Sequence, residues 1–178
     1  SIFRVEKDQQ FEAELHKDIL NVSEKELPKD IDILWSSPPC TCFSVASIGS
    51  SWCGKYHPKK TETALGMAYV LKTLELIKKI NPKYWFIENP RGVLRKMAFM
   101  EGLHRTTITY CQYGDNRMKP TDIWTNCLKW KPRPMCKNGN PCHEAAPRGS
   151  KTGTQGLKNA KYRSIVPEEL IKEIIQNC

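Results

Sequence analysis

The sequence has no uninterrupted hydrophobic run long enough to span a membrane. Its longest apolar segment, residues 64–80, is broken by four charged side chains: Lys72, Glu75, Lys78 and Lys79. No apolar signal stretch precedes the cysteines, and there are no internal repeats. The 178 residues suffice for one domain with its own core. We therefore expect an intracellular, cytoplasmic chain with reduced thiols and no membrane partner.

The sequence also lacks the cysteine spacing that is typical of zinc sites. Cys127, Cys136, Cys142 and His143 lie in a loop-rich segment and offer soft ligands for a zinc ion. However, no Cys-x-x-Cys pair occurs, and the adjacent Cys142 and His143 rarely bind one tetrahedral ion together. We therefore expect no metal, and a zinc-stabilised nucleic-acid-binding module remains an alternative.

Acidic residues are scarce in the C-terminal part of the chain. Residues 115–163 contain eleven Lys or Arg against Asp115, Asp122 and Glu144, so +8 of the net charge of +9 lies there. From residue 130 to 161 regular periodicity is absent, and prolines and glycines recur, which is typical of a functional or mobile segment. This composition indicates a nucleic acid or another polyanion as partner, or a solvated basic surface.

Strand and helix patterns alternate along the chain and predict an α/β fold. The expected strands are residues 2–5, 15–20, 31–36, 84–88, 106–110 and 122–125, and the expected helices are residues 61–80, 93–100 and 168–176. This order favours a mostly parallel sheet with both faces covered. The longest helix is expected to begin with Thr61 as its N-cap and to have an apolar face made of Leu65, Ala68, Leu71, Leu74, Ile77 and Ile80.

Two of these strands end in a chemically active side chain beside a proline. Residues 33–36 run into Pro38, Pro39 and Cys40, and residues 84–87 run into Glu88, which is followed by Asn-Pro. Proline fixes the backbone and ends the strand ladder, so backbone stiffness determines where each side chain lies. In open α/β sheets the working residues lie beyond the carboxyl ends of the strands. The alternatives are that Cys40 is a buried, inert thiol and that Glu88 is a solvated strand end.

Four blocks of the sequence resemble the DNA cytosine-5 methyltransferases, particularly the small phage and bacterial members. The blocks are residues 37–44 (Ser-Pro-Pro-Cys-Thr-Cys-Phe-Ser), 88–90 (Glu-Asn-Pro), 110–119 (Tyr-Cys-Gln-Tyr-Gly through Arg-Met-Lys) and 163–167 (Arg-Ser-Ile-Val-Pro). Their combination is far more specific than any one block.

The resemblance implies a covalent mechanism. Cys40 would add to C6 of a cytosine and so activate C5 for methylation, because C5 alone is a weak nucleophile. Glu88 would bind N3, and Arg117, with Lys119 behind it, would bind O2 and the nearby phosphate. Lys119 stands where the family has a second arginine and lacks the bidentate fork of that residue.

The resemblance also implies S-adenosylmethionine as cofactor and a Rossmann-like sheet. Glu6 matches the residue that binds the ribose hydroxyls, Asp18 matches the residue that binds the adenine amino group, and Pro38 joins the cofactor set. The glycine-rich segment and first strand of the family are missing from this chain, so the strands on either side would lack pairing. The alternative is a catalytically silent DNA-binding relative without cofactor binding.

Double-stranded DNA is the partner implied by the resemblance, and the target base must be flipped out of the duplex. Residues 41–60 would form a mobile loop at the DNA, with Ser44, Lys55 and Lys59 as contacts. Residues 126–163 would form an irregular basic recognition segment, with Arg133, Arg148, Lys151 and Gln155 as contacts. Residues 1–125 would form the partial catalytic core, and residues 164–178 a C-terminal helix packed on it.

Overall fold

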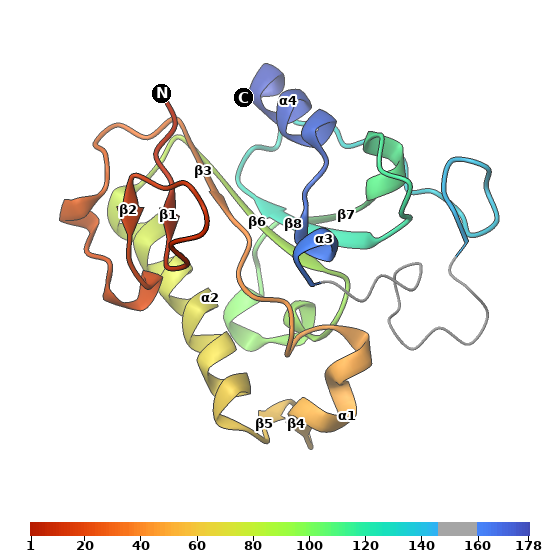
Figure 1. Ribbon diagram of the computed structural model, residues 1–178, viewed down its shortest axis with the longest axis horizontal. Coiled ribbons are helices and arrows are strands. Elements are labelled where there is room, and N and C mark those ends of the chain that lie inside the picture. The colour runs from red at the N-terminus through yellow and green to blue at the C-terminus, as the bar shows by residue number, and fades with distance from the viewer. Residues whose placement is uncertain (146–159) are drawn as a thin grey trace.

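A four-stranded sheet forms the centre of the computed structural model, which describes residues 1–145 and 160–178 (Figure 1). In the order β3-β6-β8-β7, its strands are β3 (Ile33–Ser36), β6 (Tyr84–Pro90), β8 (Pro120–Thr125) and β7 (Arg105–Thr109). β3 and β6 pair in parallel, whereas β8 is antiparallel to both β6 and β7. The prediction of a mostly parallel sheet is therefore wrong in part, because the reversed β8 makes the sheet mixed.

A second, two-stranded sheet lies near the N-terminus. β1 (Val5–Glu6) and β2 (Leu15–His16) pair in parallel, and among the described residues neither strand pairs with the central sheet. Both are shorter than predicted. Side chains attach this pair to α2 (Thr61–Ile80): the Tyr69 hydroxyl donates to Oδ2 of Asp18 at 3.1 Å.

Helix α2 has the predicted bounds, but a different face of it is buried. Its N-cap is Lys60, one residue before the predicted cap. Leu65 and Leu71 of the predicted apolar face are exposed, whereas Gly66 and Val70 are buried. A Cβ atom at Gly66 would lie 2.4 Å from Sγ of Cys42, so a glycine is needed where the helix approaches the loop after β3. Close approach of the backbone, rather than leucine content, therefore determines which face points inward.

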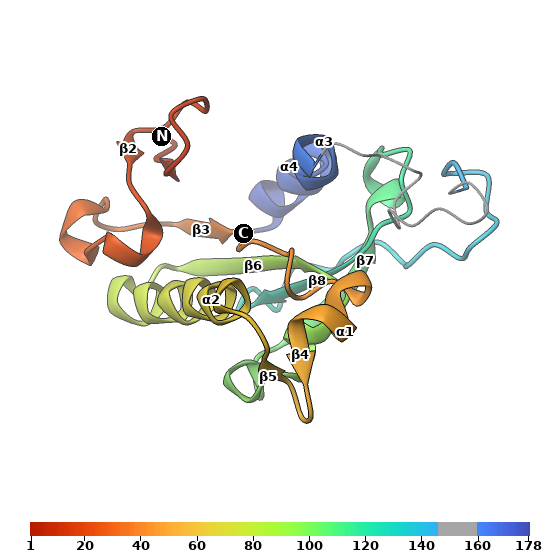
Figure 2. The same ribbon diagram turned by 60° about the horizontal axis from the view of Figure 1, so that its bottom comes forward.

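The central sheet is covered on both faces. Alternate residues of β6 point to opposite sides: Ile87 packs with Val70 of α2, and Phe86 packs with Leu170 of α4 (Glu168–Asn177). Figure 2 shows the sheet edge-on, with α2 on one side and α4 on the other. Helix α4 begins after Pro167, as predicted.

The remaining elements are short. They are α1 (Ile48–Ser51), β4 (Trp52–Cys53), β5 (His57–Pro58), α3 (Ala160–Ser164) and the 3₁₀ helices Ile19–Asn21, Glu24–Glu26, Val45–Ser47, Val93–Lys96, Ala98–Met100 and Tyr110–Tyr113. Two 3₁₀ helices thus replace the predicted helix over residues 93–100. Residues 126–145 contain neither helix nor strand. None of the helices in the described ranges is long and apolar enough to cross a membrane.

Candidate active site

Cys40 and Glu88 follow neighbouring parallel strands and meet at one edge of the central sheet. The last pair between β3 and β6 joins Ser36 to Ile87. Glu88 is the next residue of β6, and Cys40 follows β3 after a Ser-Pro-Pro loop. Because parallel strands present their carboxyl ends at the same edge, the thiol and the carboxyl share one site, as the sequence predicts.

Asn89 joins the two strand ends. Its Nδ2 atom donates a 2.9 Å hydrogen bond to the carbonyl oxygen of Pro38, two residues before Cys40. The Asn89 side chain is fully buried, and its Oδ1 atom has no hydrogen-bond partner in the described part of the chain. A buried bond of this kind fixes the loop that carries the thiol relative to the strand that carries Glu88.

Glu88 is almost completely buried and is held by two polar neighbours. The Tyr110 hydroxyl donates to Oε1 of Glu88 at 2.7 Å, and Nζ of Lys119 lies 3.8 Å from the same oxygen. Burial, followed by the nearby Glu88 charge, raises the pKa of Tyr110 well above its ordinary value. Tyr110 is therefore a neutral donor that orients the carboxyl.

Lys119 is fixed from several sides. Its Nζ atom donates to the carbonyl oxygen of Arg163 at 3.0 Å and lies 4.4 Å from the centre of the Tyr110 ring. Its backbone has φ +24°, which is uncommon for a residue with a side chain and often marks a functional position. Burial lowers the pKa of Lys119 from its ordinary value, and the Glu88 charge opposes this.

The Cys40 thiol responds to the same charges. Burial raises its pKa, the Lys119 charge lowers it, and the Glu88 charge raises it. Arg163 also lowers this pKa, so a cation from the C-terminal part of the chain acts on the thiol. Cys40, Glu88 and Lys119 thus form one electrostatically connected cluster in a mostly buried site.

Comparison with known proteins identifies the family of this chain. Residues 7–105, which contain both Cys40 and Glu88, match the model for the C-5 cytosine-specific DNA methylases. The chain belongs to this family. It is also 28% identical, over 166 residues, to the probable DNA (cytosine-5)-methyltransferase of Frog virus 3 (isolate Goorha). The aligned region covers 85% of this chain and 77% of that relative.

In this C-5 cytosine-specific DNA methylase, the two predicted basic residues have different contacts. The guanidinium of Arg117 pairs with Asp115 and donates to the carbonyl oxygens of Tyr162 at 2.7 Å and Ile165 at 3.2 Å. These bonds use most of its donors to fasten the C-terminal segment. Lys119, predicted to lie behind Arg117, is the cation that reaches the site.

The predicted cofactor residues lie in two places. Glu6 and Asp18 belong to the N-terminal sheet and its following turn, whereas Pro38 is buried in the loop before Cys40. Oε1 of Glu6 accepts one backbone N–H, and Asp18 accepts one backbone N–H and the Tyr69 hydroxyl. A carboxylate has about four acceptor sites, so both retain capacity for further donors.

The predicted DNA loop, residues 41–60, is well packed at its base. Nε1 of Trp52 donates to the carbonyl oxygen of Cys42 at 2.6 Å, and Phe43 is fully buried against Trp52. Ser44 follows this anchored base and interacts with Ser47, with 3.2 Å between their hydroxyl oxygens.

The two predicted lysines of this loop lie on its exposed part. Nζ of Lys59 donates to the carbonyl oxygen of Gly49 at 2.8 Å, and Lys55 is exposed. Both lysines can thus be reached from solvent, which a phosphate contact requires.

Arg133, a predicted DNA contact, binds other parts of the chain in this structure. It pairs with Glu169 at 3.0 Å and Glu173 at 2.8 Å, and donates to the carbonyl oxygen of Gln112. Its guanidinium also lies 4.8 Å from the centre of the Tyr113 ring. Arg133 therefore clamps the irregular segment to α4, and its contact with DNA stays a prediction.

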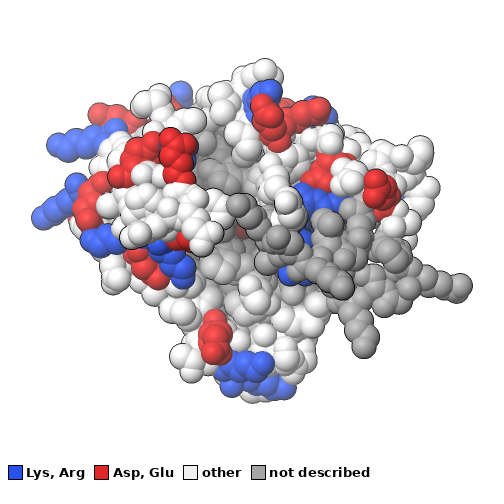
Figure 3. All heavy atoms as spheres, in the orientation of Figure 1, with Lys and Arg blue, Asp and Glu red and all other residues white. Residues whose placement is uncertain are grey.

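The other predicted contacts of the recognition segment, Arg148, Lys151 and Gln155, lie outside the described residues. On the face drawn in Figure 3, basic and acidic side chains of the described residues are interspersed. Part of the positive charge predicted for DNA is used internally, because Arg117, Lys119 and Arg133 all contact carboxylates. The basic character of the segment therefore does not translate directly into a free basic surface.

Sequence reasoning missed two residues of the site. Tyr110 is the first residue of the block 110–119 that resembles the family. Its contact with Glu88 joins residues 22 apart and is visible only in the fold. Arg163 begins another recognised block, and its effect on Cys40 arises because the C-terminal segment returns to the site.

Proposed function

We propose that this chain transfers a methyl group from S-adenosylmethionine to C5 of cytosine in double-stranded DNA, through a covalent bond between Cys40 and C6 of a flipped-out base. The observation that carries the proposal is the meeting of Cys40, Glu88 and Lys119 at one sheet edge, in a member of the C-5 cytosine-specific DNA methylases. The three side chains are a nucleophile, a carboxyl and a cation, which is the set that cytosine activation requires.

In this mechanism Cys40 attacks as the thiolate. Burial alone raises the thiol pKa, so the positive charges of Lys119 and Arg163 are needed to favour the anion. The sulfur forms a bond to C6, the electron pair of the C5–C6 double bond moves to C4–C5, and that of the C4–N3 double bond moves to N3. After C5 has received the methyl group and lost its proton, elimination of the same sulfur restores the C5–C6 double bond.

Glu88 stabilises the ring while the sulfur is attached. In its protonated form it donates to N3, which takes up electron density when the thiolate adds. Both observed contacts of the carboxyl fall on Oε1, from Tyr110 and Lys119, and we assign the other oxygen to the base. Tyr110 is a positioning residue because it acts through Glu88.

Lys119 has two roles at this site. Its charge favours the Cys40 thiolate, and its ammonium lies 3.8 Å from Oε1 of Glu88. We assign to Lys119 the contact with cytosine O2 that the sequence assigns to Arg117. A lysine offers a point charge and not a bidentate fork, which suits a single carbonyl oxygen.

Glu6 and Asp18 would bind the adenosine part of the cofactor. Ribose hydroxyls and the adenine amino group are donors, and both carboxylates retain acceptor capacity, so the chemistry of these residues fits the group. The bound cofactor supplies the methyl group. Pro38 would shape the wall of the site between the cofactor and Cys40, since it is buried and held by Asn89.

Base flipping would bring the cytosine to Cys40, because C5 and C6 are inaccessible inside a stacked duplex. Ser44, Lys55 and Lys59 lie on the loop that begins directly after Cys40. We propose that the two lysines contact phosphates beside the flipped base, while Arg148, Lys151 and Gln155 remain predicted contacts.

A methyl-transfer assay tests the proposal. The chain is incubated with S-adenosylmethionine carrying a labelled methyl group and with duplex DNA, and label in 5-methylcytosine is measured. We expect transfer by the unaltered chain and none by Cys40→Ser. Cys53→Ser is the matched control, because Cys53 is an exposed thiol on β4 and is not among the proposed contacts, and it should retain transfer. DNA binding without transfer by the folded chain would instead support the silent DNA-binding alternative.

A further inference from the structure

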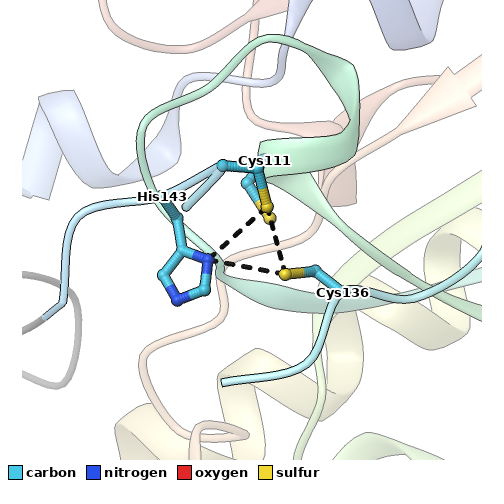
Figure 4. A group of neighbouring side chains, drawn as sticks. Cys111, Cys136 and His143 are labelled. Atoms are coloured by element: carbon cyan, nitrogen blue, oxygen red, sulfur yellow. Dashed lines mark hydrogen bonds between the residues drawn. The ribbon is translucent and has the colours of Figure 1, made fainter. Parts of the chain in front are cut away.

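Three cysteines and a histidine converge on one side of the molecule, away from Cys40. Sγ of Cys136 lies 3.2 Å from Sγ of Cys142 and 3.4 Å from Nδ1 of His143, and Cys142 lies 3.7 Å from the same nitrogen. Cys111 completes the group, and the four ligand atoms all lie within 4.8 Å of one another. Figure 4 shows the labelled side chains of Cys111, Cys136 and His143 pointing toward a common centre.

The group differs from the set considered in the sequence. Cys127 was grouped there with Cys136, Cys142 and His143, but it is buried in the core cluster of Phe86 and contacts Cys178. Cys111, 25 positions before Cys136, takes its place. The fourth member of the group is therefore Cys111, whose distance along the chain hides it from any spacing pattern.

The spacing of the four atoms is that of a tetrahedral zinc site. Zinc bonds of about 2.3 Å to sulfur and 2.0–2.1 Å to nitrogen place ligand atoms about 3.8 Å apart for two sulfurs, and about 3.6 Å apart for sulfur and nitrogen. The three pairs among Cys136, Cys142 and His143, at 3.2, 3.4 and 3.7 Å, lie near these values, and Cys111 lies within 4.8 Å of all three. Three thiolates and one imidazole match zinc in both softness and number.

The surroundings hold these ligands in place. The backbone N–H of Cys136 donates to Oγ1 of Thr109 at 2.8 Å, and Nε2 of Gln112 donates to Sγ of Cys142 at 3.5 Å. Just after His143, the backbone N–H of Glu144 donates to the carbonyl oxygen of Asn116 at 2.9 Å. Bonds of this kind orient metal ligands in known sites.

The location of these four side chains indicates a structural role for a bound metal. Cys111 belongs to the 3₁₀ helix Tyr110–Tyr113, whereas the other three ligands lie in residues 126–145, which have no helix or strand of their own. A segment without backbone ladders needs another source of stability, and a closed four-ligand zinc site supplies it. The metal would bind this segment to the turn that carries Tyr110.

We propose that Cys111, Cys136, Cys142 and His143 bind one structural zinc ion that fastens residues 131–145 to the 3₁₀ helix beginning at Tyr110. All four positions are filled by protein ligands, so the ion has no open position for a substrate. The proposal is independent of methyl transfer.

Metal analysis of the purified chain tests this proposal. We expect about one zinc ion per chain by elemental mass spectrometry, and visible absorption of tetrahedral cobalt–thiolate type after replacement with Co²⁺. Cys142→Ser and His143→Ala should lose the metal, whereas Cys53→Ser, which alters an exposed thiol outside the group, should retain it. A strong chelator should lower the melting temperature of the unaltered chain and leave that of Cys142→Ser unchanged.

Two outcomes would overturn the proposal. One is a folded chain that, after addition of zinc and removal of the unbound ion, contains no zinc, or contains as much in Cys142→Ser as in the unaltered chain. The other is a disulfide between Cys136 and Cys142, found by thiol titration as six free thiols in place of the eight cysteines of the sequence. The Sγ separation of 3.2 Å exceeds the disulfide bond length of about 2.05 Å, so we expect eight.

Discussion

The hydroxyl of Tyr110 donates a 2.7 Å hydrogen bond to Oε1 of Glu88. Glu88 lies on β6 and Tyr110 directly follows β7, so the bond spans the sheet across β8. It connects the proposed base-binding carboxyl to the turn that also carries Cys111. The orientation of Glu88 therefore depends on how this turn is held.

Tyr110→Phe should slow methyl transfer by about 10- to 100-fold, because it removes one donor, worth about 1–3 kcal/mol, that orients the buried carboxyl. The effect should appear in kcat and in its pH profile. Tyr113→Phe is the matched control: Tyr113 lies in the same 3₁₀ helix, and its hydroxyl accepts from the Arg133 N–H at 2.9 Å. It should lower stability in urea and leave the pH profile unchanged. Equal kinetic effects of the two variants would argue against a role for Tyr110 through Glu88.

Asn89→Ala should reduce both stability and the rate of Cys40 attack, because it frees the loop that holds the thiol. We expect a loss of about 1–3 kcal/mol in the free energy of unfolding. Asn126→Ala is a control at the other end of β6, where Asn126 accepts from the Trp85 N–H at 2.8 Å. It should lower stability without slowing attack once the protein is folded. A rate unchanged by Asn89→Ala would show that the bond to Pro38 does not position the thiol.

Gly66→Ala should destabilise the fold by about 1–3 kcal/mol through overpacking, because the new Cβ would lie 2.4 Å from Sγ of Cys42. Gly49→Ala, where nothing lies within 4 Å of the added carbon, is the control and should be nearly neutral. Adding Cys42→Ala to the Gly66 variant should restore part of the loss, since it removes the colliding sulfur. Chemical denaturation of the four proteins measures this, and the absence of any rescue would contradict the stated cause.

The reactivity of Cys40 should depend on pH and on the charge at position 119. A thiol reacts as its anion, so alkylation should accelerate as pH rises through the Cys40 pKa, which burial places above its ordinary value. Lys119 lowers this pKa, so Lys119→Gln should move the midpoint to higher pH, whereas Lys119→Arg keeps the charge and should move it less. Alkylation can be followed for the Cys40 peptide by mass spectrometry. A midpoint that stays in place or moves to lower pH in Lys119→Gln would contradict this account.

The proximity of Cys40 and Glu88 was predictable from the sequence because it depends on local rules. An apolar strand that runs into prolines places its last side chain at a sheet edge, and two such strands in an α/β pattern present their ends together. Cys40 and Glu88 follow from this reasoning. The bounds of α2 were predictable for the same reason, since apolar residues recur every three to four positions over the whole segment.

The remaining errors concern contacts between distant parts of the chain. Arg117 and Lys119 are two residues apart, and only the position of Asp115 and of the C-terminal carbonyls shows which one is free for the site. The two glutamates that pair with Arg133 come from α4, and no local pattern in the sequence connects them to it. Cys111 could not be grouped with Cys136 by spacing, because the turn and the irregular segment meet only in the folded chain.

Trapping of the covalent complex tests the central claim most directly. The chain is incubated with S-adenosylmethionine and duplex DNA that contains 5-fluorocytosine, in which no C5 proton is available for removal, so the sulfur–C6 bond persists after methyl transfer. We predict a protein–DNA complex stable to denaturation, with the modified peptide mapped to Cys40 and no complex in Cys40→Ser. Failure of the folded chain to form it, while it binds both the cofactor and DNA, would contradict the proposed mechanism.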